Sequence, residues 1–388
     1  MKNEVRVALL LDKSAAYDRG LIRGIVNNLD PDWQWSFFFE NPYHIIKSFY
    51  KKVIRDLFSW RPDFIVTNDT SLIPKLKELN VPIFATPSNH KIKDVINIIA
   101  DDEKIGQIGA KHFINSGFNN LAFYGSDRIF WSKNRRISFR DMVLSHGLNY
   151  FEEEASLLKD WQKNPYRLQK WIESLPKPVG IMACQDDFAL QVTEAANLAE
   201  ANIPFDVAVL GVDNDFFLCN LYKPSLSSID QEPESVGLKV ARAIQEGLID
   251  ENQLPEEIMG NNYHIIPRLS SEVTAIADEE LRKAVLFIKE NIEFRDITVN
   301  DVMEVTCLSR RSLEMRFRNV LNQSIKQVIT RERLKIACQK LRNSDLSVNE
   351  IAYSLGFSSP SSFSSFFKKE KGCSCKDYQQ QFQKMKEL

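Results

Sequence analysis

Long apolar runs are absent from this 388-residue sequence. No stretch approaches the roughly 20 apolar residues that a membrane-spanning helix requires. Residues 7–11 form an apolar run near the start, but it is too short for a secretory signal, and no small-residue cleavage site follows it. Apolar residues make up 44% and charged residues 26% of the chain, a mixture that excludes collagen-like and disordered acidic chains. The length suggests two or three domains.

Cysteine and histidine are scarce. The six cysteines are scattered, and only Cys373 and Cys375 lie close together, without a nearby histidine. This excludes a small disulfide-stapled fold, indicates a metal site only weakly, and leads us to expect reduced thiols in a cytoplasmic protein. The five histidines follow no metal-ligand spacing, and the Gly-x-Gly-x-x-Gly, P-loop and Gly-x-Ser-x-Gly motifs are absent. We therefore expect neither an enzyme nor a bound metal or cofactor.

A strong net charge is also absent, because the chain as a whole carries −2. That value hides an asymmetry. Residues 1–278 hold 30 Lys and Arg against 38 Asp and Glu, whereas residues 279–388 hold 20 against 14. An acidic first part and a basic final part suggest that the first binds a small molecule or a protein and that the second binds a polyanion. Charge alone leaves open the alternative of an ordinary basic helical domain.

Apolar runs typical of β-strands alternate with helical patterns over residues 1–268. Strands separated by single helices indicate right-handed βαβ units and a parallel sheet covered on both faces. Because this stretch is long for one doubly wound sheet, we expect two lobes. The predicted strands are 5–11, 33–39, 64–67, 82–85, 121–124, 179–183, 207–211 and 264–267, and the helical patterns lie in 21–29, 45–60, 105–113 and 189–199.

Polar side chains follow several of these strands, where ligands bind in doubly wound sheets. A sugar-binding site needs carboxylates, amides and arginines that form paired hydrogen bonds with vicinal hydroxyl groups. It also needs an aromatic ring that packs against the C–H face of the sugar. Any single aspartate at a strand end could instead cap the next helix, but four such edges together favour a polar ligand site. The candidate sugar-binding residues are Asp12, Tyr17, Asp18, Trp131, Arg135, Gln185, Asp186 and Asp213.

Short segments of this part carry a family resemblance: Asp-Glu at 102–103, Gly-Gln-Ile-Gly-Ala at 106–110, Gly-Phe at 117–118, Leu-Ala-Phe-Tyr-Gly at 121–125, Gln-Asp at 185–186 and Leu-Gly-Val-Asp at 210–213. Residues 4–268 resemble the effector domain of LacI/GalR repressors, which is itself similar to periplasmic sugar-binding proteins. The resemblance implies a sugar-sensing domain, residues 1–268, with one lobe of residues 1–100 and 231–268 and another of residues 101–230. It also implies ligand contacts for Arg135, for the Gln185-Asp186 pair, where the family has Asn-Asp, and for Asp213.

The last part of the chain contains an internal repeat. Thr-Val-Asn-Asp-Val at 298–302 recurs as Ser-Val-Asn-Glu-Ile at 347–351, and each segment is a capping box that opens a helix. Further along, the apolar positions 313 and 317 recur as 363 and 367. Each unit is therefore a short capped helix, a turn containing serine and a second helix. This pattern predicts two helix-turn-helix motifs joined by a long helix.

The second helix of each motif is expected to enter a major groove of DNA. Arginine reads guanine bidentately and glutamate accepts from cytosine, whereas serine discriminates bases weakly and lysine holds phosphates. The alternative is a helical interaction module with solvated arginines, and the doubled capping box, the turns and the basic charge argue against it. The candidate DNA-binding residues are Arg310, Arg311, Glu314, Arg318, Pro360, Ser361, Ser364, Ser365, Lys368 and Lys369.

This region also resembles a known family. Arg-Leu at 333–334, Ile-Ala at 351–352 and Gly-Phe at 356–357 resemble the AraC/XylS DNA-binding domain, although Met315, Cys375 and Gln379 depart from its pattern. We therefore assign residues 279–388 to a DNA-binding domain and residues 269–278 to a linker. The expected fold is a two-lobed α/β domain like that of periplasmic binding proteins, followed by an all-α domain with two helix-turn-helix motifs.

The order of the two domains resembles the family of xylose-operon regulators, as do Ala-Tyr-Asp-Arg at 16–19 and the Trp131–Arg135 spacing. That likeness implies a D-xylose-dependent activator that binds repeated operator half-sites as a homodimer and acts on RNA polymerase. The residues themselves support only a polar, sugar-like effector. Two alternatives stay open: the effector is another pentose or a plant-derived sugar, or the chain is a DNA-binding protein that senses no sugar.

Overall fold

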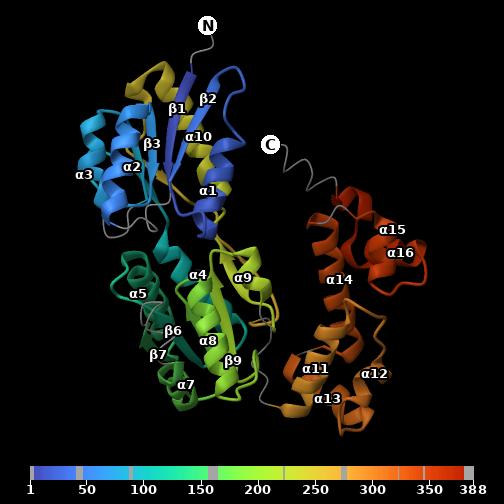
Figure 1. Ribbon diagram of the computed structural model, residues 1–388. Coiled ribbons are helices and arrows are strands. Elements are labelled where there is room, and N and C mark those ends of the chain that lie inside the picture. Colours follow the sequence, from blue (N-terminus) through green and yellow to red (C-terminus); the bar gives the residue numbers. More distant parts are fainter. Residues whose placement is uncertain are drawn as a thin grey trace. The chain divides into compact units, whose positions relative to one another are not determined.

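The computed structural model describes residues 4–40, 47–86, 91–155, 165–221, 223–271, 278–321, 323–343 and 346–379. The chain divides into two compact units, Met1–Val273 and Thr274–Leu388 (Figure 1), and each is described by itself. The division falls inside the predicted linker 269–278, of which residues 272–277 lie outside the described residues. Among the residues that the structure describes, no helix combines the length and the apolar character needed to cross a membrane.

The first lobe of the first unit is built on a six-stranded parallel sheet with the strand order β11-β5-β4-β3-β1-β2. In the central strand β1 (Glu4–Leu10), Val7 and Leu9 join one apolar core and Ala8 and Leu10 join another, because successive side chains of a strand point to opposite faces. Helices α1 and α10 cover one face, and α2 and α3 cover the other (Figure 1). The remaining bounds are β2 Gln34–Glu40, β3 Phe64–Thr67, β4 Ile83–Ala85, β5 Ile96–Ile99, β11 Glu257–Met259, α1 Ala16–Val26, α2 Lys47–Trp60, α3 Ile73–Leu76 and α10 Pro233–Ile249.

The second lobe contains a six-stranded sheet with the order β12-β10-β9-β8-β6-β7, in which only β10 and β12 pair antiparallel. Strands β8 and β9 are buried over their whole length, as expected for strands covered on both faces. The bounds are β6 Asn120–Gly125, β7 Asn149–Glu154, β8 Val179–Ala183, β9 Val207–Val212, β10 Ser227–Asp230, β12 His264–Ile266, α4 Asp102–Asn115, α5 Phe130–Ser145, α7 Pro165–Ser174, α8 Asp186–Leu198 and α9 Phe216–Leu221.

The chain crosses between the lobes after β5, after β10 and again between β11 and β12. The last crossing corrects one predicted boundary, because residues 231–268 were all assigned to the first lobe. Strand β12 instead pairs with β10 of the second lobe, through the registers Ile265 to Ile229 and His264 to Asp230. Residues 264–266 therefore belong to the second sheet.

The second unit is helical, and it contains the predicted pair of helix-turn-helix motifs. Both predicted capping boxes are present: Thr298 with Asp301 opens α12, and Ser347 with Glu350 opens α15. At the turn after α15, Gly356 has φ of 78°, and a Cβ there would lie 2.5 Å from the backbone nitrogen of Asp296, so only glycine fits. The bounds are α11 Glu279–Asn291, α12 Val299–Glu304, α13 Arg310–Leu321, α14 Ile325–Asn343, α15 Val348–Ser354 and α16 Pro360–Lys371.

Candidate functional site

A cavity of about 260 Å³ lies at the carboxyl ends of the strands, with walls from both lobes of the first unit. Asp12 and Asp18 come from the first lobe, Arg135 and Asp213 from the second, and Gln231 from a crossing segment. The cavity is slightly smaller than the roughly 300–1,000 Å³ of pockets for drug-sized ligands, so it suits a ligand of one ring. Seven of the eight candidate residues line it: Asp12, Tyr17, Asp18, Trp131, Arg135, Gln185 and Asp213.

The wall from the first lobe presents carboxylates held by backbone and amide donors. Asp18, in the first turn of α1, accepts a hydrogen bond from the backbone nitrogen of Asp12 at 2.7 Å and another from the Asn68 side chain. Burial raises the pKa of Asp18 to about 7, and the neighbouring carboxylates of Asp12 and Asp213 add to this rise. The carboxylate of Asp12 accepts from the backbone and hydroxyl groups of Ser14. Burial also raises the pKa of Tyr17.

Arg135 is the buried cation of the cavity. It lies on α5, is only 4% exposed, and its guanidinium is 4.8 Å from the Trp131 ring one turn earlier. Its Nε donates to Asp102 Oδ1 at 2.9 Å, and Nη1 donates to the Cys184 carbonyl at 2.8 Å. These bonds fix the guanidinium plane, so that a planar donor and an aromatic ring face the cavity together.

Asp213 lies directly after β9 in an uncommon backbone conformation. Its φ is 103°, and that of Asn214 is 50°, so two consecutive residues occupy the left-handed side of the Ramachandran plot. Backbone strain of this kind is concentrated at functional sites. The carboxylate accepts from Gln231 Nε2 at 2.5 Å. Burial raises the pKa of Asp213 to about 6, although the positive charge of Arg135 opposes the rise.

Asp186 is not among the residues that line the cavity, and its contact with a ligand stays a prediction. Its side chain is 1% exposed and has protein partners on both oxygens. Oδ1 accepts from the Ser228 hydroxyl at 2.6 Å, and Oδ2 accepts from the backbone nitrogen of Asp215 at 2.8 Å. A Cβ on Gly211 would lie 2.1 Å from Oδ1, so glycine at this strand end makes room for the carboxylate. Asp186 therefore joins the ends of β9 and β10.

Sequence reasoning did not select four further polar residues of the cavity, which are Asn68, Thr86, Asp102 and Gln231. Asn68 follows the correctly predicted strand β3, so the strand-end rule could have found it. Gln231 follows β10, which was not among the predicted strands. Asp102 was noted only as part of a family resemblance, and its place beside Arg135 depends on the packing of α4 against α5.

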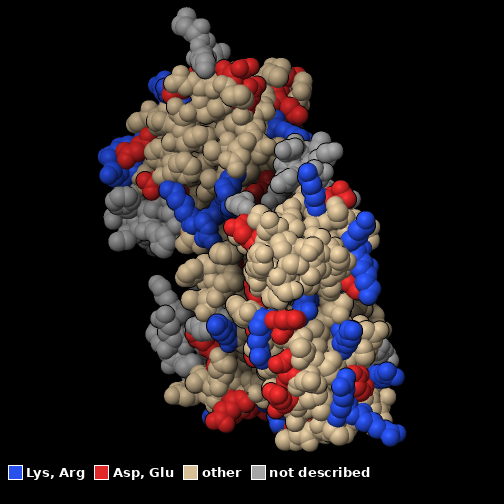
Figure 2. Space-filling model, turned by 90° about the vertical axis from the view of Figure 1, so that its right-hand side faces the viewer, with Lys and Arg blue, Asp and Glu red and all other residues tan. Residues whose placement is uncertain are grey.

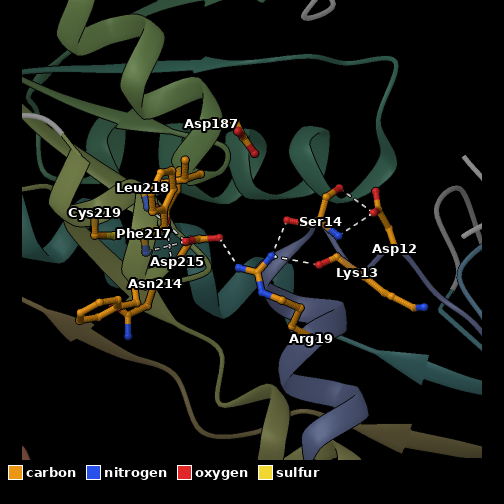
Figure 3. A network of polar contacts seen from close by, with 12 residues as sticks. Asp12, Lys13, Ser14, Arg19, Asp187, Asn214, Asp215, Phe217, Leu218 and Cys219 are labelled. Atoms are coloured by element: carbon orange, nitrogen blue, oxygen red, sulfur yellow. Dashed lines mark hydrogen bonds and ion pairs between the residues drawn. The ribbon is translucent and has the colours of Figure 1, made fainter. Parts of the chain in front are cut away.

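An ion pair between Arg19 and Asp215 connects the two lobes of this unit (Figure 3). Arg19 of α1 donates from Nη2 to Asp215 Oδ2 at 2.6 Å, and it also bonds to the carbonyls of Ser14 and Lys13. The other oxygen of Asp215 accepts from the backbone nitrogens of Phe217 and Leu218 and so caps α9. Asp215 is thus a helix cap and an inter-lobe contact at once.

In the helical unit, the second helix of each motif has the expected apolar face. Leu313 and Phe317 of α13, and Phe363 and Phe367 of α16, are fully buried. Glu314 is half-buried, and its carboxylate lies 3.5 Å from the backbone nitrogen of Ile325. Pro360 is half-buried at the start of α16. The other candidates are exposed: Arg310, Arg311, Arg318, Ser361, Ser364, Ser365, Lys368 and Lys369.

Within the described ranges, no group of three or more His, Cys, Asp or Glu side chains is arranged to hold a metal ion.

Comparisons with known proteins agree with this architecture. Residues 110–271 match a periplasmic binding protein-like domain, and residues 302–381 match a helix-turn-helix domain. The chain is 27% identical over 387 residues to the xylose operon regulatory protein of Escherichia coli K12, covering 96% of each chain. It is 26% identical to the protein of the same name in Haemophilus influenzae, covering 94% of this chain and 95% of that one.

Solved structures show the same relationship. A xylose-binding transcription activator aligns with a TM-score of 0.72 and 25% identity, covering 98% of this chain and 99% of that chain. A LacI family regulator from Enterococcus faecium with bound ribose aligns with a TM-score of 0.56 and 17% identity over 70% of this chain and 99% of that one, which shows the fold of the first unit alone. The relatives that match over nearly the whole chain are transcription regulators, and the chain is accordingly a regulator and not an enzyme.

Proposed function

We propose that this chain, in which a periplasmic binding protein-like domain precedes a helix-turn-helix domain, is a transcription activator with D-xylose as its effector. The observation that carries the proposal is the composition of the cavity between the lobes. Carboxylate acceptors, a fixed guanidinium and an indole ring line a space of about 260 Å³. The choice of D-xylose follows the two relatives that match nearly the whole chain, which are named for the xylose operon, and the aligned activator that binds xylose.

The chemistry of the wall suits a small sugar. Asp18 and Asp213 accept hydrogen bonds from hydroxyl groups, and Gln185 both donates and accepts. Trp131 supplies an aromatic surface for the C–H face of the ring. Another pentose would meet the same groups, and ribose is bound to one regulator of similar fold. A related sugar is therefore the second candidate.

The proposed switch is a population shift between open and closed lobes. A sugar that contacts Asp18 and Arg135 at once makes bonds in the closed state that the open state does not offer. Closure then changes the surfaces of the lobes and the spacing of two DNA-binding domains in a homodimer on operator half-sites. Such an activator acts on RNA polymerase in the cytoplasm, where the operator DNA lies.

A thermal-shift experiment with the full chain tests the effector. At 100 times its Kd, a sugar stabilises its domain by about 2.7 kcal/mol. For a unit of this size that is a rise in Tm of roughly 5–10 °C. D-xylose is expected to give this shift, and D-ribose and L-arabinose a smaller one. A larger shift with another sugar would reassign the effector, and no shift with any sugar would remove sugar sensing from the proposal.

DNA binding is tested separately. A duplex selected from a random library by the full chain should bind more tightly than a scrambled duplex, and D-xylose should change that affinity. A protein that selects a duplex but ignores every sugar would be a sugar-independent DNA-binding protein.

A further inference from the structure

Cations of the helical unit fall into two classes. Basic and acidic side chains are interspersed over the face shown in Figure 2, so charge by itself does not locate an anion site. Ion pairing is more informative. Among the described residues, six cations pair with carboxylates of the same unit, namely Lys283, Arg295, Arg316, Arg331, Arg333 and Lys340. In contrast, Arg318, Lys326 and Lys369 make no ion pair with any residue that the structure describes.

These three cations line one groove of about 790 Å³, whereas Arg310, Arg311 and Lys376, which also lack an ion pair among the described residues, lie outside its lining. Arg318 comes from the end of α13, Lys326 from the first turn of α14 and Lys369 from the end of α16, so both helix-turn-helix motifs contribute. Arg331 is a fourth cation in the wall, and Glu370 is the one carboxylate. The full lining of this basic groove is Arg318, Gln323, Ser324, Lys326, Gln327, Thr330, Arg331, Leu334, Lys369 and Glu370.

Four cations against one carboxylate leave the basic groove positively charged and without an internal counter-ion for three of them. Arg331 is held in place, since Nη1 donates to Gln323 at 2.8 Å and Nη2 donates to Glu332 at 2.6 Å. The hydroxyl and amide groups of Ser324, Gln327 and Thr330 add neutral polar atoms to the wall. This combination of lysine, arginine, hydroxyl and amide groups is the set that contacts phosphate oxygens.

We propose that the basic groove holds the phosphate backbone of duplex DNA between the two major grooves that α13 and α16 enter. The inference rests on the proposed function as a DNA-binding regulator. It adds Lys326 and Arg331 of α14, which lie outside both recognition helices, to Arg318 of α13 and Lys369 of α16. Successive major grooves on one face of DNA are about 34 Å apart, and the backbone crosses between them. At about 1.5 Å per residue, the 19 residues of α14 span roughly 28 Å, so this helix bridges most of that distance.

The groove contributes affinity but not sequence preference. Lys326 is a point charge on a flexible stem, and phosphate contacts fix position without reading bases. Removing a single lysine–phosphate interaction changes the slope of log K against log salt by about 0.9, which corresponds to roughly fivefold in affinity at 0.15 M salt. The decrease in affinity should be equal for a selected and a scrambled duplex.

The test uses the full chain and three single variants. Lys326→Gln removes one exposed cation of the groove, Glu370→Gln removes its carboxylate, and Lys376→Gln is the matched control, an exposed lysine outside the groove lining. Salt titrations with a selected and a scrambled duplex give Kd and the salt slope. Lys326→Gln should weaken both complexes about fivefold with a slope smaller by about 0.9, and Glu370→Gln should tighten both. Lys376→Gln should change neither.

A modified duplex sharpens the assignment. Neutral methylphosphonate linkages placed between the two recognition segments should weaken the wild-type complex, and they should weaken the Lys326→Gln complex less, because one of the groove cations is already removed. If Lys326→Gln binds with the wild-type affinity and slope, the groove does not hold DNA, and an acidic protein segment becomes its candidate ligand. If the wild-type chain binds no duplex, the proposed function itself fails, and that result is distinct from failure of the groove alone.

Discussion

Replacing Arg19 with glutamine removes the ion pair that joins the two lobes of the first unit. Arg19 Nη2 lies 2.6 Å from Asp215 Oδ2, and the two side chains are 40% and 8% exposed. An exposed pair contributes about 0.2–1 kcal/mol, and a buried hydrogen bond to a charged group about 1.5–3 kcal/mol. Because Arg19 is more than one-third exposed, solvent screening places this pair near the lower range, at about 1 kcal/mol.

In the proposed switch the pair forms only in the closed state, so its removal should shift the equilibrium toward the open state. About 1 kcal/mol corresponds to a roughly fivefold change in the ratio of closed to open molecules. The apparent Kd for D-xylose should therefore rise by up to about fivefold in Arg19→Gln. Fluorescence of Trp131, which lines the cavity, offers a direct titration signal.

Arg23→Gln is the matched control, because Arg23 lies on the same helix and pairs with Glu234 inside the first lobe, at 3.2 Å. It should leave the Kd for D-xylose unchanged. Asp215→Asn in a double-mutant cycle measures the coupling, since asparagine still caps α9. Equal Kd values for Arg19→Gln and Arg23→Gln, or tighter binding in Arg19→Gln, would refute the idea that this pair stabilises the closed state.

Three further variants test the site. Asp213→Asn tolerates the positive φ and should abolish the Tm shift with D-xylose while basal DNA affinity stays the same; an unchanged shift would remove Asp213 from the site. Burial raises the pKa of Asp18 to about 7 from its usual value near 4, so the folded state binds more protons between these values and stability should fall as pH rises from about 4 to 7. In Asp18→Asn, the part of the decrease of Tm with pH that Asp18 causes should be absent. A decrease identical to that of the wild type would contradict the raised pKa of Asp18. Arg311→Ala should cost about 1–3 kcal/mol on a selected duplex and much less on a scrambled one, and equal weakening would make Arg311 a phosphate contact.

The sequence predicts best those strands whose apolar residues fill both faces of a sheet. Strands β3 and β8 were predicted with their observed bounds, because all their side chains are buried. Strand β7 contains three glutamates at a half-exposed sheet edge, so apolar patterning does not mark it. Strand β10 is buried but begins with two serines, whose hydroxyls bond to Arg268 and Asp186. Polar strands of this kind depend on partners that are distant in the sequence.

Prediction of the candidate site is limited in the same way, because it too depends on contacts between residues that are distant in the sequence. Asp186 and Asp213 look equivalent in the sequence, since each follows a buried strand closely. They differ because Ser228 and the backbone of Asp215 occupy both oxygens of Asp186, whereas the positive φ of Asp213 belongs to a turn at the cavity. Neither the pairing of β9 with β10 nor the backbone conformation of residue 213 can be read from residue types.

Residues 213–215 bring three different connections to one strand end. Asp213 lines the cavity, Asn214 accepts from Arg268 Nη2 at 2.6 Å, and Asp215 bonds to Arg19 of the other lobe. Arg268 immediately precedes the segment 269–278 that was predicted as the linker. Because the three residues are consecutive, we expect a ligand that moves Asp213 to affect the inter-lobe pair and the Arg268 contact as well. The turn after β9 is therefore the part of the first unit where one covalently continuous segment lines the cavity and bonds both to Arg19 of the other lobe and to Arg268.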